Sequence, residues 1–310
     1  MTPWLSVIVP VHEGARYLDA TLAAAAAERP DGVEFLLYDS GDDDGACRRI
    51  ATRYAERMDL RYCATPDCKP WTAKTNRGVQ AAAAPHVVML HQDDLWLTGH
   101  VSALRRAIAE APEAAMSIAP SVFVSARGRE VGRWNLPFAP GIHASADIAA
   151  ALLVQNTIAI PSPVIRRDAW LAVGGMDEPL WYTADWDLYL KLALHGPVHV
   201  RDAATTAFRL HGSSLTMTGS RSPADFRAQL ESVLERHLPA LSPELRRKHE
   251  PMARTAIAVN CALAARRKGG GEALRRLAAL GPAGLGRFLA ASRLVDRIVP
   301  RIRLSLAGEM

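Results

Sequence analysis

Two carboxylates stand side by side in the first third of the chain, directly after an apolar run. Asp93 and Asp94 follow the strand-like segment His86 to Leu90, with little basic charge around them. Adjacent carboxylates repel each other, which costs stability unless the two share a cation. Their type and spacing indicate a hard divalent metal ion. Capping of a helix that starts near Leu97 is an equally good explanation of this pair taken alone.

A second acidic segment, Asp39-Ser40-Gly41-Asp42-Asp43-Asp44-Gly45, follows another strand-like run. A carboxylate at Asp39 could accept hydrogen bonds from a nucleobase, and Asp44 could cap the helix that follows. The alternative is a solvated loop that binds nothing. Taken alone, the segment is more typical of such a loop than of a site.

Asp185 stands where an amphipathic helix is expected to begin, because Leu188, Leu192 and Ala193 recur after it at helical spacing. At a helix N-terminus a carboxylate stays ionised and can accept a proton from a substrate hydroxyl. A plain N-cap is the alternative interpretation. Asp187, in the first turn of the same helix, is expected only to interact with the helix dipole.

One histidine is a candidate metal ligand. His211 lies in the loop after the strand-like Thr205 to Phe208, and imidazole is a common ligand of metal ions. A lone histidine in a loop more often has no such role, so the residue carries weight only together with the carboxylates.

These candidates fall at the ends of elements that alternate regularly along the chain. Such alternation predicts an α/β fold with a mostly parallel sheet covered by helices on both faces, and these sheets bind ligands at the carboxyl ends of their strands. Further strands are expected at Met116 to Ser125 and Ile158 to Ile165. The expected strands of the first half are Leu5 to Val11, Glu34 to Asp39, Leu60 to Cys63 and His86 to Leu90, and the expected helices are Ala15 to Arg29, Cys47 to Met58 and Ala73 to Ala83.

From Pro223 onward the pattern is helical and the charge changes. Residues 241 to 310 hold 14 Lys and Arg against 5 Asp and Glu, a balance of +9 within an overall +5. These basic residues lie on Ala- and Leu-rich patterns with few aromatics between them, so no nucleic-acid partner is expected. We predict a catalytic α/β domain over residues 1–220 and a basic α-helical region over 221–310, with helix breaks at Pro251 and Pro300 among others.

The last part of this region has an amphipathic pattern between Gly284 and Arg303. One interpretation is a helix that packs on the catalytic domain or on another subunit, with snorkelling arginines. The other is peripheral contact with the inner face of the cell membrane, where basic residues meet anionic lipid and Pro300 interrupts the helix. The apolar residues are Leu285, Phe288, Leu289, Val295, Val299 and Ile302, and the cations are Arg287, Arg293, Arg297, Arg301 and Arg303.

Composition agrees with a folded protein in a reducing compartment. The 310 residues are 49% hydrophobic and 22% charged, and the four cysteines lack the close pairs of a zinc site. Neither a signal peptide nor a membrane-spanning helix is expected, since the first apolar run is short and no later run is long and uncharged. We therefore expect a cytoplasmic protein.

Taken in order, the segments resemble the inverting glycosyltransferases of the bacterial family 2 type, which have the GT-A fold. The similarity spans about residues 4 to 215 and departs from the family at Ser40, His91 and Ala184, which replace two aspartates and a glutamate. Asp185 is then the only carboxylate at the base position. The matching segments are Ser6 to Glu13 (first strand and turn), Asp39 to Gly45 (Asp-Asp-Gly-Ser-x-Asp), Lys74 to Gly78 (Asn-x-Gly), Leu90 to Asp94 (Asp-x-Asp), Pro161 to Asp177, Ala184 to Asp185 (Glu-Asp) and Phe208 to His211.

This resemblance implies a nucleotide-diphosphate sugar as donor, most simply a UDP-sugar, and a glycan or lipid-linked acceptor, as in polysaccharide biosynthesis. It implies that Asp93 or Asp94, together with His211, holds Mg²⁺ or Mn²⁺ against the diphosphate. It also implies that Asp185 accepts the proton of the acceptor hydroxyl, which gives inversion. The implied donor-binding residues are Asp39 on the base, Pro10 and Glu13 near the nucleoside, and Asn76, Arg77 and Asp93 along the pocket.

Two other functions stay open at this point. A nucleotidyltransferase would make nucleotide sugars on a similar scaffold, but such enzymes usually carry a Gly-rich basic loop that Pro10 to Gly14 lacks. A non-catalytic protein of the same fold would bind the sugar nucleotide without transfer, and His91 and Ala184 are compatible with it. Fold alone does not decide between these functions.

Overall fold

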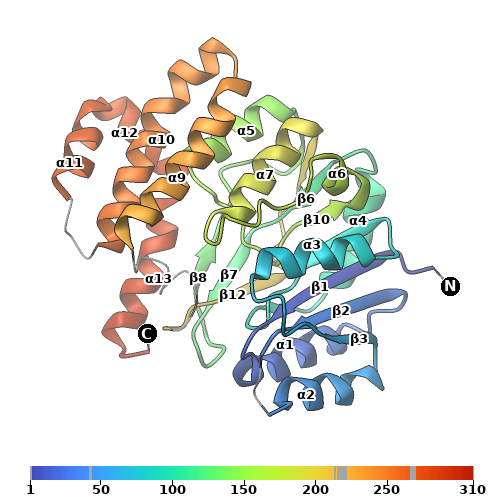
Figure 1. Ribbon diagram of the computed structural model, residues 1–310. Coiled ribbons are helices and arrows are strands. Elements are labelled where there is room, and N and C mark those ends of the chain that lie inside the picture. The colour runs from blue at the N-terminus through green and yellow to red at the C-terminus, as the bar shows by residue number, and fades with distance from the viewer. Residues whose placement is uncertain (1, 42–43, 213, 215–221, 266–269, 310) are drawn as a thin grey trace.

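The computed structural model describes residues 2–41, 44–212, 214, 222–265 and 270–309. Its N-terminal part has the predicted alternation of strands and helices (Figure 1). Four strands pair in parallel in the order β3-β2-β1-β4. They are β1 (Leu5–Val11), β2 (Val33–Asp39), β3 (Asp59–Ala64) and β4 (His86–Met89), and the helices between them are α1 (Ala15–Ala27), α2 (Ala46–Ala55) and α3 (Trp71–Ala81).

The sheet continues beyond β4 with four shorter strands and becomes mixed. β10 (Val164–Arg166) runs antiparallel between β4 and β6 (Met116–Ile118), and β11 (Val198–Val200) and β9 (Gly141–His143) complete the eight strands. The expected α/β architecture with a large central sheet is therefore confirmed. Strand β9 and the antiparallel direction of β10 were not predicted.

A second sheet lies beside the first, with the order β5-β12-β7-β8. It explains why Met116 to Ser125 is not one strand: the segment divides at Pro120, which has no N–H to donate to a ladder, and its halves join different sheets. Pro161 and Pro163 likewise confine the expected strand Ile158 to Ile165 to its last residues. The strands of the second sheet are β5 (Leu95–Trp96), β7 (Ser121–Val124), β8 (Glu130–Trp134) and β12 (Thr206–Arg209).

Helices cover both faces of the large sheet because alternate residues of its strands face opposite sides. Val7 and Val9 of β1 pack with α1, α2 and α4 (His100–Glu110), whereas Ile8 packs with α3 and with the helices that follow. The hydrophobic cluster around Ile8 includes residues of α5 (Ser145–Val154), α6 (Arg167–Ala172), α7 (Ala184–His195), α9 (Pro223–His237) and α10 (Pro243–Ala264). The first C-terminal helices thus share a core with the sheet.

The C-terminal region is helical, as expected, and it breaks near Pro239 and Pro282, but two other predicted breaks are absent. Pro251 and Pro300 lie inside continuous helices, so the expected interruptions there are wrong. The ring of Pro300 packs where Gly132 has no side chain, and a Cβ at Gly132 would come within 2.5 Å of it. The break falls instead at Arg293, whose φ of 48° is left-handed. The last helices are α11 (Gly270–Ala279), α12 (Gly281–Ser292) and α13 (Leu294–Leu306), and a short 3-10 turn spans Leu238–Ala240.

Of the two interpretations of the amphipathic tail, packing on the α/β part describes α13, which lies against β8 (Figure 1). Contact with a membrane stays a prediction, for which Val295 and Ile302 supply exposed apolar surface. Within the described residues, every helix is too short or too polar to span a bilayer. The predicted boundary near Gly219 to Pro223 falls largely outside those residues.

Candidate functional site

Asp39, the last residue of β2, is held from two sides at the carboxyl edge of the sheet. The Tyr62 hydroxyl of β3 donates to Asp39 Oδ2 over 2.8 Å, and the Gly41 N–H donates to Oδ1 over 2.8 Å. Burial and this bond raise the pKa of Tyr62 to about 12, so the phenol keeps its proton. The carboxylate is thus oriented beside the end of β1, where Pro10 pairs in register with Tyr38.

The loops around Asp39 are tightly turned. Glu13 has a left-handed φ of 50°, and a Cβ at Gly41 would come within 2.9 Å of its backbone nitrogen. Asp42 and Asp43 lie outside the described residues. The expectation that Asp44 caps the next helix is wrong, because α2 has Gly45 at its N-cap and no side-chain cap bond.

Lys74, which the sequence analysis did not identify as a site residue, joins the end of β1 to the loop after β2. Its Nζ donates to the Val11 carbonyl over 2.5 Å and to the Ser40 hydroxyl over 2.8 Å, and the residue is 1% exposed. Burial lowers the pKa of Lys74 to about 8, against the opposing effect of Asp39. Helical spacing could have predicted that Lys74 is buried, because it lies on the same face of α3 as Gly78.

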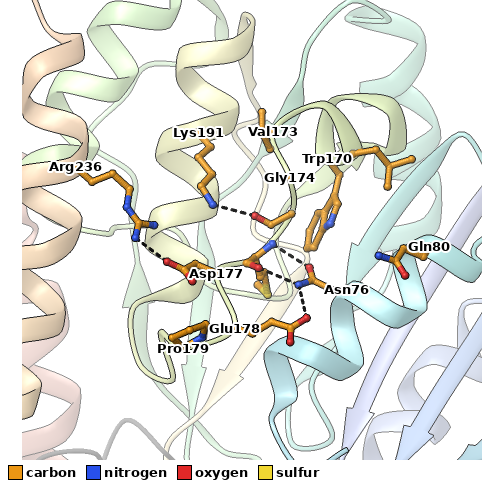
Figure 2. Close-up of a pocket in the computed structure, with 13 residues that line it drawn as sticks. Asn76, Gln80, Trp170, Val173, Gly174, Asp177, Glu178, Pro179, Lys191 and Arg236 are labelled. Atoms are coloured by element: carbon orange, nitrogen blue, oxygen red, sulfur yellow. Dashed lines mark hydrogen bonds and ion pairs between the residues drawn. The ribbon is translucent and has the colours of Figure 1, made fainter.

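Asn76 and Arg77 lie further along α3, and their contacts are of different kinds. The Asn76 amide donates to the Met176 carbonyl and to Glu178, and its oxygen accepts the Met176 N–H over 2.9 Å (Figure 2). Asn76 therefore fixes the loop that leads into α7. Arg77 is exposed and lies 3.6 Å from Asp67.

This loop borders a surface pocket of about 680 Å³ between α3 and α7. Lys191 donates to the Gly175 carbonyl over 3.1 Å, and Arg236 pairs with Asp177 over 2.7 Å (Figure 2). With Asn76, these bonds occupy most of the polar groups drawn around the pocket. The pocket is therefore best understood as the supported outer side of the loop that precedes Asp185.

Asp93 and His211 meet as the sequence predicted, since β12 ends next to the loop after β4. His211 Nε2 lies 2.7 Å from Asp93 Oδ2, and the Arg209 side chain donates to the Asp93 carbonyl over 2.8 Å. The predicted alternative of a helix cap is wrong, because α4 begins at His100 with Gly99 as its N-cap.

Asp94 is more deeply placed, at 1% exposure. Its Oδ1 accepts the Arg209 N–H over 3.1 Å, while Oδ2 is enclosed with no hydrogen-bond partner among the described residues. Burial and the neighbouring Asp93 raise the pKa of Asp94 well above its ordinary value. An enclosed acceptor without a donor is a position that a cation could satisfy.

The fit of a divalent metal to these groups is partial. In the part of the chain that the structure describes, no three His, Cys, Asp or Glu side chains form a group ready to hold a metal. Two carboxylates and an imidazole nevertheless match Mg²⁺ or Mn²⁺ bound mainly through a substrate diphosphate, since such ions take few protein ligands there. His91 adds no charge, because burial lowers its pKa to about 4.

Gln92, which the sequence analysis also did not identify, holds the loop after β1 through two hydrogen bonds. Its side chain accepts the His12 N–H over 2.8 Å and donates to the His12 carbonyl over 3.1 Å, and its own carbonyl accepts the Thr21 hydroxyl. The metal-motif segment and the first loop are thus one unit. Local pattern gives no sign of this pairing, which joins positions 80 residues apart.

Asp185 lies in the first turn of α7, after Thr183 at the N-cap. Its Oδ2 accepts one side-chain hydrogen bond, from the Asn156 amide over 2.9 Å. Burial raises the pKa of Asp185 to about 6, against the bonds from Trp186 N–H and Asn156 that lower it. The carboxylate is therefore a stronger base than an exposed aspartate and is still mostly ionised at neutral pH.

Tyr189 connects the two acidic sites. It is fully buried, and its hydroxyl has no hydrogen-bond partner among the described residues. Burial first, then the charges of Asp185 and Asp94, raise its pKa. Both carboxylates therefore lie within electrostatic reach of one side chain.

The first half of the chain also matches a known family. Residues 6–156 match the model described as "Glycosyl transferase family 2". An uncharacterized glycosyltransferase of Rickettsia typhi is 20% identical over 247 residues, which are 76% of this chain and 73% of the relative. A second, from Rickettsia conorii, is 21% identical over 209 residues, and the match spans only 34% of its length against 67% of this chain.

Solved structures show the same fold. S. aureus TarS 1–349 in complex with UDP-GlcNAc has a TM-score of 0.63 at 15% identity, with 98% of this chain and 92% of that chain covered. The mannosyltransferase PcManGT from Pyrobaculum calidifontis, in complex with GDP-Man and Mn²⁺, has a TM-score of 0.57 at 15% identity, with 94% and 86% covered. The expected GT-A fold and the resemblance to family 2 are confirmed.

Proposed function

We propose that this chain, whose residues 6–156 belong to glycosyl transferase family 2, is an inverting, metal-assisted glycosyltransferase. It moves a sugar from a nucleotide-diphosphate sugar to an acceptor hydroxyl. The observation that carries the proposal is a pair of acidic sites: Asp185, held by Asn156 in the first turn of α7, and Asp93, in contact with His211 beside the enclosed Asp94. An in-line displacement needs a base on the acceptor side and a cation on the leaving side.

Donor binding in this proposal begins at Asp39. Its carboxylate, held by Tyr62 and Gly41, accepts a hydrogen bond from an N–H of the nucleobase, as uracil N3–H would supply. Pro10 and Glu13 lie along the nucleoside. The nucleotide sugars bound by the TarS and PcManGT structures support this donor class, and a UDP-sugar is our first choice.

The diphosphate lies at Asp93, Asp94 and His211, where the two carboxylates alone would repel it. Asp93, Asp94 and His211 would hold Mg²⁺ or Mn²⁺ there, which would supply positive charge to stabilise the departing diphosphate. His211 holds the Asp93 carboxylate in place, and Arg209 fixes the loop from its backbone side. Asn76 supports the loop before α7, and Arg77, whose exposed side chain pairs with Asp67, is proposed to contact the donor from the outer face of α3.

Asp185 then acts on the acceptor. As the acceptor oxygen forms its bond to the anomeric carbon, its proton moves to Asp185, and the bond from that carbon to the diphosphate oxygen breaks. Attack from the face opposite the leaving group inverts the anomeric configuration. The Asn156 amide keeps the carboxylate oriented toward that hydroxyl. The acceptor is proposed to be a glycan or a lipid-linked sugar.

One observation favours a second candidate, a protein that binds the donor without transferring it. His91 stands in place of the first acidic residue of the metal motif and is neutral. Metal-dependent binding could then persist with a weaker charge on the leaving side. Nothing in the site favours the nucleotidyltransferase alternative over these two.

A donor panel tests the proposal. Nucleotide sugars are screened with Mn²⁺ by thermal shift, because a ligand of the native state raises the melting temperature, and hits are assayed for release of the nucleoside diphosphate. We expect one donor to bind and to be hydrolysed slowly, with Glu56→Ala, an exposed site, unchanged as control. Binding without release would favour the second candidate, and no binding by any donor would contradict both.

A further inference from the structure

Helix α13 brings two arginines, Arg297 and Arg301, together on one face, four positions apart. Neither forms an ion pair with a carboxylate anywhere in the described chain, although both side chains are largely enclosed. Burial and the neighbouring charge of Arg301 lower the pKa of Arg297 to about 10, which still leaves it charged at neutral pH. Like charges at this spacing repel, and an enclosed charge without an opposite partner is unfavourable.

The contacts of this pair are all with neutral groups. Arg297 donates to the Asn260 side chain over 3.1 Å, and its other terminal nitrogen is enclosed without a partner among the described residues. Arg301 donates to the Arg297 carbonyl and lies over the Phe123 ring, 5.6 Å from its centre. The two guanidinium groups therefore retain donors and charge that the described part of the chain does not satisfy.

An unbroken set of hydrogen bonds joins this pair to the proposed base. Asn260 donates to the Gln155 side chain over 2.9 Å, and Gln155 donates to the Asn156 carbonyl over 3.3 Å. The Asn156 amide then bonds Asp185 over 2.9 Å. Arg297 is thus three side chains from the carboxylate that receives the proton.

Tyr182 gives an independent measure of the same proximity. Burial raises its pKa, Arg297 and Arg301 lower it, and Asp185 raises it. One ring is therefore within electrostatic reach of both arginines and of the base. The arginines lie on the acceptor side of the proposed site, since the donor groups are gathered at Asp39 and Asp93.

Helix α13 packs against β8 (Figure 1), and hydrogen bonds from its other residues anchor it there. Asn135 donates to Asp296 over 3.0 Å, and Arg303 donates to the Val131 carbonyl over 3.3 Å. Arg293 donates to the Leu136 carbonyl over 2.6 Å. These anchors use the other polar groups of the helix and leave Arg297 and Arg301 for a ligand.

We propose that Arg297 and Arg301 form an anion subsite that binds a phosphate or carboxylate group carried by the acceptor. The inference rests on the proposed function, because it names the class of acceptor for the same site. Guanidinium groups suit both anions through charge-assisted, paired hydrogen bonds. Binding an anion here would also relieve the repulsion between the two arginines.

The test compares small anions on the parent, Arg297→Gln, Arg301→Gln and the control Arg287→Gln, an exposed arginine of α12. Thermal shift without metal is measured against glucose 6-phosphate, glucuronate and glucose. We expect the two charged sugars to stabilise the parent and the control, with the concentration for half effect raised about tenfold in either subsite variant, the loss of one charge-assisted contact. Neutral glucose should have no effect.

Donor binding and hydrolysis with Mn²⁺ are measured on the same variants and should change by less than about twofold, since remote, independent sites contribute separately. Equal anion effects in all four proteins, or a loss of donor affinity as large as the loss of anion affinity, would overturn the subsite. If Arg297→Gln does not fold, Arg301→Gln and Arg297→Lys carry the test, the latter with an intermediate effect. Anion binding needs no donor, so failure of the proposed function is separately visible.

Discussion

Helix α7 carries two carboxylates only two residues apart, Asp185 and Asp187, and their pKa values are shifted in opposite directions. Asp185 has one side-chain hydrogen bond, and burial raises its pKa to about 6. Asp187 is fully buried, and its pKa is lowered to about 2, because bonds from His237 and Lys191 outweigh the effect of burial. Arg236 adds a further ion pair over 2.9 Å.

Both residues lie in the first turn, within the same helix dipole, so the dipole cannot explain the difference. Their partners differ instead: α9 supplies the Arg236 guanidinium and the His237 imidazole to Asp187, while the segment after α5 supplies only the Asn156 amide to Asp185. The expectation that Asp187 interacts only with the dipole is therefore wrong. A carboxylate surrounded by cations stabilises the fold, and one left almost alone can exchange a proton.

The largest expected effect in this comparison is on stability. Asp187→Ala removes the buried carboxylate that Lys191, Arg236 and His237 share, and breaking a buried ion pair costs about 3–5 kcal/mol. Asp185→Ala should change the free energy of unfolding by less than about 1 kcal/mol, since it removes one side-chain hydrogen bond, the one from the Asn156 amide. Urea denaturation of both variants measures the contrast. Equal losses would show that the two sides of the helix do not differ as proposed.

Substitutions at the proposed metal site should weaken the binding of the donor. Asp93→Ala and Asp94→Ala should each weaken Mn²⁺-dependent donor binding by about tenfold or more, and His211→Ala by a smaller factor, as for groups that orient a metal ligand. Calorimetric titration with Mn²⁺ and then with EDTA separates the metal-dependent part. Normal donor binding in both aspartate variants would make the pair structural.

A smaller effect should appear when Asn156, the side-chain hydrogen-bond partner of Asp185, is replaced. The Asn156 bond stabilises the ionised carboxylate, so Asn156→Ala should raise the pKa of Asp185 further above about 6. Transfer needs the ionised form, and the rate therefore falls as pH drops through that pKa. We expect a rate a few-fold lower near pH 6, about the worth of one charge-assisted bond, and recovered near pH 8.

The control for that variant is Gln80→Ala, an exposed position on α3 that should leave the pH profile unchanged. If Asn156→Ala lowers the rate equally at all pH values, the amide has only a structural role. If the acid limb moves to lower pH, the sign of the hydrogen-bond effect is wrong.

Sequence pattern was sufficient to predict strands and helices whose formation depends mainly on neighbouring residues. β1 has the predicted bounds, Leu5–Val11, and α1 and α3 differ from prediction by about two residues, the usual uncertainty at helix ends. The encounter of Asp93 with His211 was implied by the family resemblance and not by local pattern, since the two residues follow strands of different sheets.

Tertiary partners could not be read from the sequence. Lys74 pairs with a carbonyl 63 positions away, and Asn156 bonds Asp185 across 29 positions. Neither pairing has a local period or motif, because both depend on how the layers pack. Pro300 makes the same point, since its place inside a helix depends on the absence of a side chain at Gly132.

The central claim is that Asp185 is the base of a transfer reaction, and Asp185→Asn tests it most directly. The substitution keeps the size of the side chain and removes its ability to accept the proton. Transfer rate and donor affinity are measured on the parent and the variant with the same donor and Mn²⁺. We predict a rate lower by about a hundredfold or more, with donor affinity within a few-fold of the parent. A residual rate above about a tenth of the parent rate would contradict the assignment.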